Sequence, residues 1–327
     1  MMMILGIDVA KDKVEVALFN DKQFIASGEF TNTAAGFKKL SQWLTNKEAK
    51  AVWACMEATG RYGDALATYL HEQKHNVSVV NPARIKKYAE SQLKRNKTDK
   101  LDAKTIADFC RTQEPALWTP PAPEKRALQE MVRRLHALIV ARTRERNRLK
   151  AGLESAVVKT SVTESLEFLT SQIAHLTEQI QAHINQYPAL KAAQHLLTSI
   201  KGIGDKTAFI IMGELPDVTR FANSGQVTAY AGLSPQQHTS GTSVRKKTRL
   251  TKTGNQALKT ALYFPALSAL QHNPLVKALA TRLQERGKEK MVIVGAAMRK
   301  LLQLVYGVLK SGQPFDPEYL THAQGAA

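Results

Sequence analysis

Three prolines at positions 120, 121 and 123 divide the sequence into two parts whose hydrophobic residues follow different periods. Before them, short apolar runs alternate with segments of helical spacing, whereas after them helical spacing prevails to about residue 311. Clustered prolines end helices and mark linkers, because each ring fixes φ and removes a backbone donor. The 327 residues also correspond to about two domains. We therefore expect an α/β domain over residues 1–115, followed by a mainly helical region.

The first part predicts three strands, a helix, a strand, a helix, a strand and further helical segments, in that order. The turn Asn20-Asp21 lies between the second and third strands, as in a β-hairpin. This order predicts a mixed sheet with helices packed on it. The expected strands are residues 3–9, 14–19, 24–30, 51–56 and 77–80, and the expected helices are residues 33–44, 63–71, 82–93 and 100–109.

The second part predicts an antiparallel helical hairpin and then a largely helical C-terminal domain. Two apolar stripes, over residues 128–153 and 166–187, have near-heptad spacing, and we expect the turn between them near residues 158–163. Residues 291–309 form a strongly apolar helix that Lys and Arg interrupt at 299–300, so we assign it to the core. The expected divisions are a hairpin over 124–187, a C-terminal domain over 190–316 and a tail over 317–327.

The charge balance favours a polyanionic partner. The chain has 46 Lys and Arg against 28 Asp and Glu, a formal net charge of +18, and residues 218–284 contain nine basic and no acidic residues. A region with one sign of charge suits the phosphates of nucleic acid. No apolar run reaches the ~18 residues of a spanning helix, and the start lacks the features of a signal peptide. Cys55 and Cys110 lack metal-binding spacing, so we expect reduced thiols and a cytoplasmic, nucleoid-associated protein.

Four carboxylates in the first part form the main candidate site. Asp8 and Glu57 each end an apolar strand, where a charge is costly unless it is paired or binds a metal. Asp99 and Asp102 are three positions apart at the start of a helix and share one face. Such hard oxygen ligands suit Mg²⁺, for which Mn²⁺ can substitute. Bound Mg²⁺ activates a nucleophile and stabilises the leaving oxygen in phosphodiester chemistry.

Each of these carboxylates also has a structural alternative. Asp8 could pair with a lysine at position 11 or 13, and Glu57 could cap the helix that follows it. Asp99 and Asp102 could simply favour a helix N-terminus. The four together, after a three-strand start, favour the metal site.

A glycine-rich turn in the C-terminal part is a candidate phosphate-binding element. Lys201, Gly202, Gly204 and Lys206 lie between two helical segments, and the glycines would let backbone N–H groups face a phosphate. The pattern resembles a helix-hairpin-helix element, which binds the nucleic-acid backbone and so confers little sequence choice. The alternative is a plain turn between two helices with a glycine cap.

A basic loop with serines follows this turn. Ser240-Gly241-Thr242-Ser243 forms a polar turn, and we expect the cations after it to bind nucleic acid. A serine hydroxyl becomes a nucleophile only where a base or metal activates it and cations stabilise the developing charge. Otherwise a serine here is an ordinary turn residue. The cations are Arg245, Lys246, Lys247, Arg249 and Lys252.

Three segments of the first part resemble the DEDD insertion-sequence transposases, a family that includes the Piv-type DNA invertases and is newly described as bridge-RNA-guided recombinases. They are GIDVAKDK, MEATGRY and RNKTDKLDAKTIADFC. The resemblance implies an N-terminal domain with a ribonuclease-H-like fold, similar to the RuvC Holliday-junction resolvase. It matches Asp8, Glu57, Asp99 and Asp102 one by one to the metal ligands of the family.

The C-terminal part resembles the same family, so that the likeness covers residues 3–316. The family carries SG-x-S-x-R before a segment ending in K-x-GN, and its first serine is the proposed nucleophile. Here that serine matches Ser240, with Ser243 as the second candidate. Relatives often have a glycine after the arginine, whereas this chain has Lys246, which leaves the geometry of the loop open.

The resemblance also implies partners and an assembly. Residues 124–187 resemble the coiled-coil linker of the family, which supports a homo-oligomer, either a dimer or a tetramer. Active sites would then be composite, with carboxylates from one subunit facing a serine from another. The partners would be double-stranded donor and target DNA together with a guide RNA.

The sequence thus predicts a transposase that exchanges DNA strands through a serine-linked intermediate in the presence of Mg²⁺. One alternative is a RuvC-like nuclease that uses water as the nucleophile. The other is a non-catalytic nucleic-acid-binding protein, in which binding would depend on residues 142–150, the glycine turn and residues 245–252.

Overall fold

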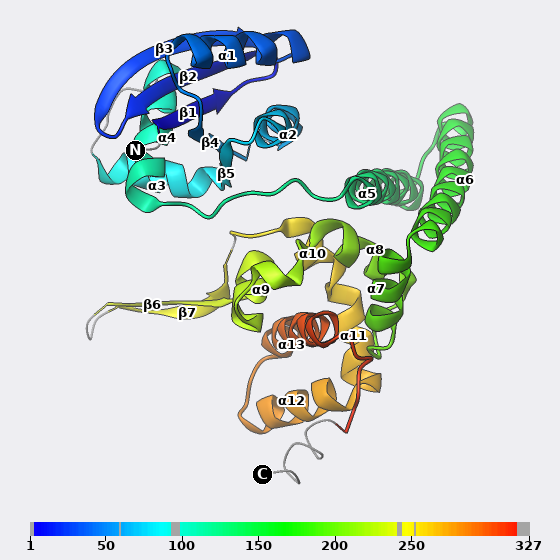
Figure 1. The fold of residues 1–327 in the computed structure, drawn as a ribbon. Coiled ribbons are helices and arrows are strands. Elements are labelled where there is room, and N and C mark those ends of the chain that lie inside the picture. Colours follow the sequence, from blue (N-terminus) through cyan, green and yellow to red (C-terminus); the bar gives the residue numbers. More distant parts are fainter. Residues whose placement is uncertain (1–2, 59, 93–98, 241–243, 252, 319–327) are drawn as a thin grey trace. The chain divides into compact units, whose positions relative to one another are not determined.

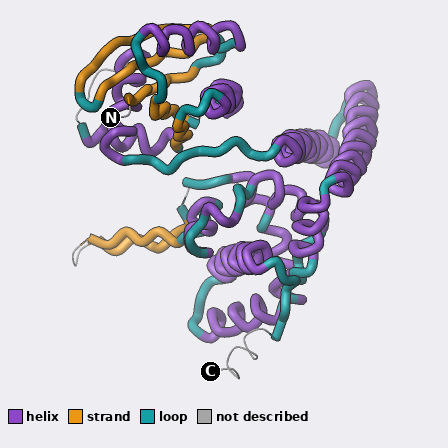
Figure 2. The backbone as a smooth tube through the Cα atoms, in the orientation of Figure 1, coloured by secondary structure: helices purple, strands orange, loops and turns teal. Residues whose placement is uncertain are grey.

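The computed structural model describes the chain except residues 1–2, 59, 93–98, 241–243, 252 and 319–327; the side chains of residues 61, 99–101, 237–240 and 244–248 are also left undescribed. The chain divides into two compact units, Met1–Pro121 and Ala122–Ala327. The first unit combines a sheet with helices, and the second is mostly helical (Figure 2). Each unit is described by itself.

The N-terminal unit is built on a mixed five-stranded sheet in the order β3-β2-β1-β4-β5 (Figure 1). Strands β1, β2 and β3 are antiparallel neighbours, while β4 is parallel to β1 and β5 is parallel to β4. This confirms the predicted order of strands and fits a ribonuclease-H-like domain. The strands are β1 (Met3–Val9), β2 (Lys13–Asn20), β3 (Gln23–Thr31), β4 (Val52–Glu57) and β5 (Asn76–Val80).

Helices cover both faces of this sheet. One buried cluster joins Leu5, Ile7 and the other residues of one face to α1 and α2. A second cluster joins Ile4 and Cys55, on the opposite face, to α3 and α4. Because both faces of β1 are covered, the sequence of this strand is a nearly continuous apolar run. The helices are α1 (Ala34–Asn46), α2 (Asp64–Glu72), α3 (Pro82–Ser91) and α4 (Asp99–Gln113), with a short 3₁₀ turn at Gly60–Tyr62.

Helix α4 lies directly against the central strand β1. A Cβ atom on Gly6 would lie 2.1 Å from the backbone oxygen of Ala103, so only glycine permits this approach. Cys55 of β4 and Cys110 of α4 are both free thiols and both buried. The hydrogen bond between them and their burial raise the pKa of the Cys110 thiol.

In its described residues, the C-terminal unit is mostly helical and contains one two-stranded ribbon, β6 (Pro235–Ser240) and β7 (Val244–Leu250). Proline is the first residue of α5, α7 and α12. At this position a backbone N–H makes no hydrogen bond within the helix, so the helix loses none when proline stands there. The helices are α5 (Pro123–Lys150), α6 (Ala156–Gln186), α7 (Pro188–Thr198), α8 (Asp205–Glu214), α9 (Ser224–Tyr230), α10 (Gln256–Ala261), α11 (Tyr263–His272), α12 (Pro274–Glu285) and α13 (Lys290–Ser311), with a 3₁₀ turn at Val218–Arg220.

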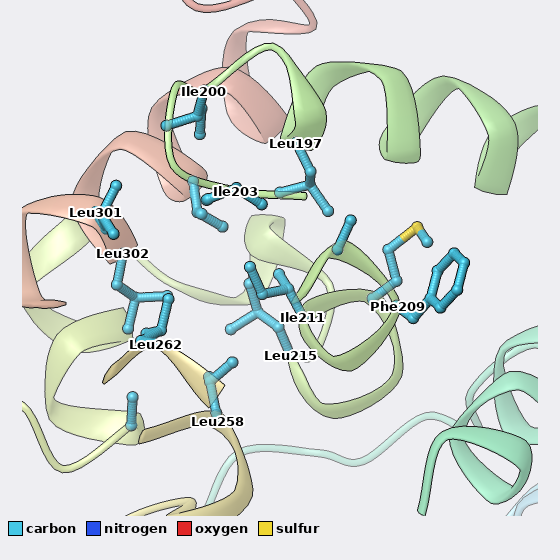
Figure 3. Packing of buried hydrophobic residues seen from close by; sticks show 14 of the residues in the cluster. Leu197, Ile200, Ile203, Phe209, Ile211, Leu215, Leu258, Leu262, Leu301 and Leu302 are labelled. Atoms are coloured by element: carbon cyan, nitrogen blue, oxygen red, sulfur yellow. The ribbon is translucent and has the colours of Figure 1, made fainter. Parts of the chain in front are cut away.

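One buried cluster runs through the whole C-terminal unit. It includes Leu128 and Leu135 of α5, Ile180 of α6, and residues of α7 to α13. Figure 3 shows the part of this core where side chains from α7, α8 and the loop between them pack near α13. Helices α5 and α6, which the sequence predicts as a separate hairpin, therefore share their core with the C-terminal helices.

Two local expectations for this unit were wrong in detail. The turn of the helical hairpin lies at residues 151–155 instead of 158–163, because Gly152 adopts φ +89° and the Ser155 hydroxyl caps α6 by accepting from the Val158 N–H. The basic segment predicted as a loop forms the β6–β7 ribbon, with Ser240 paired to Val244.

Helix α13 is the apolar helix expected from the sequence. Its mean hydropathy of 1.6 and its length would suit a membrane span, but 56% of its apolar window is buried inside the structure. Leu301, Leu302 and Val305 are fully buried in the core cluster. The helix therefore has the burial of a core helix, as predicted.

Candidate active site and nucleic-acid-binding elements

Two of the predicted carboxylates lie side by side on neighbouring strands. In the parallel pairing of β1 with β4, Ile7 lies opposite Met56, and the next positions along the two strands are Asp8 and Glu57. Both residues are half-buried. Alternation along each strand puts Asp8 on the same face as Ile4 and Glu57 on the same face as Cys55. This is the sheet face that α3 and α4 cover.

The start of α4 lies toward the same end of this face. Arg111 near the end of α4 interacts electrostatically with Asp21, in the turn that adjoins the beginning of β1. Helix α4 therefore runs opposite to β1, and its first turn lies toward Asp8. Asp102 is half-buried and precedes Ala103, which touches Gly6. Asp99 is the first residue of the helix, and its side chain is outside the described part.

A further carboxylate, which the sequence reasoning missed, lies directly opposite Asp8. Glu15 of β2 pairs with Asp8 across the antiparallel ladder, so the two side chains share a face. Glu15 is only 6% exposed, and its Oε1 accepts a hydrogen bond of 2.7 Å from Lys13 Nζ. Its Oε2 is buried and has no hydrogen-bond partner among the described residues. The sequence does contain a sign that Glu15 is buried, since it stands between Val14 and Val16 in an apolar strand.

The donor set of this region fits a hard divalent cation in its chemistry. It consists of carboxylate oxygens, which Mg²⁺ and Mn²⁺ prefer, and it includes the buried Oε2 of Glu15, for which the described residues provide no hydrogen-bond partner. Within the described ranges, however, no three His, Cys, Asp or Glu side chains lie close enough together to hold a metal ion. The metal site therefore stays a prediction.

The predicted glycine turn joins α7 to α8. Gly202 has φ +107°, and a Cβ there would lie 2.9 Å from the Ala269 Cβ, so the close packing of α11 requires glycine. A Cβ on Gly204, the N-cap of α8, would meet nothing within 4 Å. Lys201 and Lys206 are exposed on either side. The turn is thus open at Gly204, with a cation before it and another after it.

The predicted nucleophile lies near the tip of the β6–β7 ribbon, which extends away from α9 (Figure 1). Ser240 is the last residue of β6, and Thr239 pairs with Arg245 while His238 pairs with Lys246. The side chains of Ser240, Arg245, Lys246 and Lys247 are outside the described part, and so are residues Ser243 and Lys252 altogether. Arg249 is exposed on β7.

The base of the ribbon is held by a polar network that the sequence did not suggest. Glu214, at the end of α8, is 4% exposed and accepts hydrogen bonds from Arg133 Nε at 2.6 Å and Arg133 Nη2 at 3.1 Å. Asn255 Nδ2 donates to the same carboxylate at 3.0 Å. Burial by itself would raise the pKa of Glu214, but the hydrogen bonds from Arg133 and Asn255 hold that pKa below its ordinary value.

Two family models and several known proteins match this chain. Residues 5–158 match a DEDD transposase model, and residues 194–281 match the model of the transposase IS116/IS110/IS902 family. The pilin gene-inverting protein of Moraxella bovis is 32% identical over 95% of this chain and 97% of its own length. The transposase for insertion sequence element IS1111A of Coxiella burnetii is 26% identical over 82% of this chain and 78% of its own.

A solved structure of T. thermophilus RuvC in complex with a Holliday junction substrate matches 36% of this chain and all of its own, at 12% identity and a TM-score of 0.29. That score is too low to carry an argument, so the family rests on the sequence matches. These matches define an enzyme that recombines DNA. The chain belongs to the IS110 family of DEDD transposases, together with the pilin gene-inverting proteins.

Proposed function

We propose that this recombinase cuts and joins DNA in a divalent-metal-dependent reaction, through a covalent link between DNA and Ser240. The observation that carries the proposal is the placement of Asp8 and Glu57 on adjacent parallel strands, at the end of the sheet face toward which α4 begins. Carboxylates in such a place suit a metal ion that binds a phosphate, and a membrane or small-molecule function has no comparable support.

Asp8, Glu57, Asp99 and Asp102 would hold the metal ion. When bound, Mg²⁺ supplies a Lewis acid that polarises the phosphate and stabilises the departing oxygen. Asp8 and Glu57 are fixed by the ladder between β1 and β4, and Asp102 by the contact of the adjacent Ala103 with Gly6. The residues are therefore positioned by the sheet and by a tightly packed helix.

Ser240 would supply the nucleophile. Its hydroxyl oxygen forms a bond to the phosphorus of a DNA phosphodiester, while the bond from that phosphorus to one deoxyribose oxygen breaks. The serine loses its proton and the departing sugar oxygen gains one. A sugar hydroxyl of the partner strand then attacks the phosphoserine, which releases the serine and joins the strands. The basic residues of β7 would stabilise the charge on the phosphate.

The nucleic-acid partners would bind mainly through backbone contacts. The open turn at Gly204, with Lys201 and Lys206 beside it, supports a helix-hairpin-helix role in holding a DNA phosphate. The family resemblance supports a guide RNA that reads the target by base pairing, a homo-oligomer held by α5 and α6, and action at the nucleoid. Arg249 and the other cations of the ribbon would contact donor or target DNA.

The test is a trapping experiment with the full-length protein. The protein is incubated with Mg²⁺, a donor DNA end and its flanking transcript, and a protein–DNA adduct that survives denaturation is sought. We expect an adduct in the wild type and in S243A, and none in S240A or D8A. An adduct that forms in S240A would contradict the assignment of the nucleophile. DNA cleavage that leaves no adduct, survives S240A and is lost in D8A would support a hydrolytic nuclease instead.

A further inference from the structure

The polar network around Glu214 joins three parts of the C-terminal unit that are far apart in sequence. Glu214 ends α8, Arg133 lies in α5, and Asn255 is the N-cap of α10, five residues after the end of β7. Both carboxylate oxygens accept hydrogen bonds, Oε1 from Arg133 and Oε2 from both Arg133 and Asn255. A single buried carboxylate thus connects the long helix to the segment that leads from the ribbon into α10.

Asn255 is bonded both to the segment that precedes the ribbon and to the helix that follows it. Its backbone N–H donates to the Tyr230 carbonyl at 2.7 Å, and its Oδ1 caps α10 by accepting from the Leu258 N–H at 3.0 Å. Immediately before it, Gly254 has φ +136° and lies so close to Gly232 that a Cβ would be 2.4 Å from the Gly232 nitrogen. The segment that leads into β6 and the segment that leaves β7 are therefore in close contact next to Asn255.

A contribution to the stability of the fold does not explain why a carboxylate occupies position 214. Glu214 is the last residue of α8, where the helix dipole disfavours a negative charge. Desolvation of the charge is also unfavourable, because the Glu214 side chain is 4% exposed, although that of Arg133 is 48% exposed. Its neighbours along the chain, Ile211 one helical turn before it and Leu215 directly after it, are fully or almost fully buried apolar residues. A charged group that accepts three hydrogen bonds from two partners instead specifies their relative position.

We propose that Arg133, Glu214 and Asn255 form an anchor that holds the serine-bearing ribbon in a fixed orientation relative to α5. The three are positioning residues, because they act through the ribbon and touch no reacting atom. The proposal rests on the proposed function, in which Ser240 must be presented to a phosphate held elsewhere. A ribbon of two strands that projects from the helices (Figure 1) gains a fixed orientation from an anchor near the end of β7.

The decisive variant is Asn255→Ser. Serine retains the N-cap of α10 but is too short to reach Glu214, so the cap survives and the anchor is lost. A matched control is Asn223→Ser, since Asn223 caps α9 by accepting from the Gln226 N–H at 3.1 Å and has no contact with Glu214. A second variant, R133M/E214M, removes both charges of the anchor together, so that no unpaired charge is left in the interior.

The orientation of the ribbon is measured by electron–electron distance spectroscopy. Spin labels are placed at exposed Gln236 of β6 and Ala137 of α5, in a protein whose native cysteines are buried. We expect the distance distribution to broaden severalfold in N255S and in R133M/E214M, and to stay narrow in N223S. Circular dichroism melting serves to show that each variant is folded.

Adduct formation is measured on the unlabelled variants in parallel with the distance measurements. We expect the rate of adduct formation to fall at least tenfold in N255S with DNA affinity unchanged, and to stay at the wild-type value in N223S. A narrow distance distribution in both anchor variants would overturn the proposal. A broadened distribution with an unchanged rate of adduct formation would overturn the positioning role. If the wild type forms no serine adduct at all, the proposed function fails, and the distances alone then decide whether the anchor exists.

Discussion

At the scale of single residues, the environment of a carboxylate decides its chemistry. Asp8 and Glu15 are neighbours across the β1–β2 ladder. Only Asp8 ends an apolar run, so the sequence pattern indicates a candidate ligand at Asp8 and not at Glu15. Glu15 is the more deeply buried of the two, with 6% of the residue exposed, whereas Asp8 is half-buried. Lys13 satisfies one of its oxygens and leaves the other buried without a partner in the described structure.

This arrangement makes Glu15→Gln an informative substitution. We expect E15Q to bind Mn²⁺ about tenfold more weakly than the wild type, since a neighbouring carboxylate strengthens a metal site by this order. Isothermal titration calorimetry with Mn²⁺ and no DNA measures the affinity directly. The control is E29Q, because Glu29 pairs with Glu15 on β3 but has a side chain that is 58% exposed. Equal Mn²⁺ affinity in E15Q and E29Q would remove Glu15 from the metal site.

A second residue, His75, makes the stability of the N-terminal unit depend on pH. Burial lowers the pKa of His75 below its ordinary value of 6.5, and its Nδ1 accepts a hydrogen bond from the Val52 N–H at 3.4 Å. Between the lowered pKa and 6.5 the unfolded chain binds more protons than the folded one. The free energy of unfolding therefore falls as the pH falls through this window.

We expect H75Q to lose this dependence, since a glutamine stays neutral at every pH in the window. The measurement is urea unfolding at pH 7.5 and pH 5.0, followed by the fluorescence of the three tryptophans, all of which lie before residue 121. The wild type should lose more stability than H75Q on acidification. An identical loss in both proteins would assign the dependence to other groups.

At the scale of secondary-structure elements, the sequence predicted what local patterns specify and missed what tertiary pairing specifies. The order of strands and helices in the first unit was predicted, because each apolar run has its own turn signals. The sequence predicts a loop where the β6–β7 ribbon forms, because the cations obscure any alternation and the pairing of the two strands is visible only in the fold. Glu214 was missed for the same reason, because its burial depends on α5 and α10, which lie far from it in sequence.

The contact between α4 and β1 yields a prediction for a whole element. In G6A the new methyl group would meet the Ala103 carbonyl, so α4 must move away from the sheet. We expect a loss of about 3 kcal/mol in the free energy of unfolding, together with weaker Mn²⁺ binding, because the first turn of α4 carries Asp99 and Asp102. Tryptophan fluorescence in urea measures the stability.

A matched control for this substitution is Gly307→Ala in α13. A Cβ there would meet nothing within 4 Å, so the change should stabilise the protein by about 0.5–1 kcal/mol through helix propensity. Circular dichroism in urea measures it. If G6A were as stable as the wild type, the close packing of α4 on β1 would not be what positions these aspartates.

At the scale of the whole molecule, the carboxylates and Ser240 belong to different compact units, Met1–Pro121 and Ala122–Ala327. If the active site is composite, the carboxylates of one subunit act with the serine of another. Mixing two inactive variants, D8A and S240A, then restores activity, because a mixed dimer contains one site with both changes and one site with neither. We expect recovery of up to about a quarter of wild-type adduct formation for a dimer that exchanges subunits freely. If each site lay within one subunit, every site in the mixture would carry one change, and the mixture would be as inactive as its components.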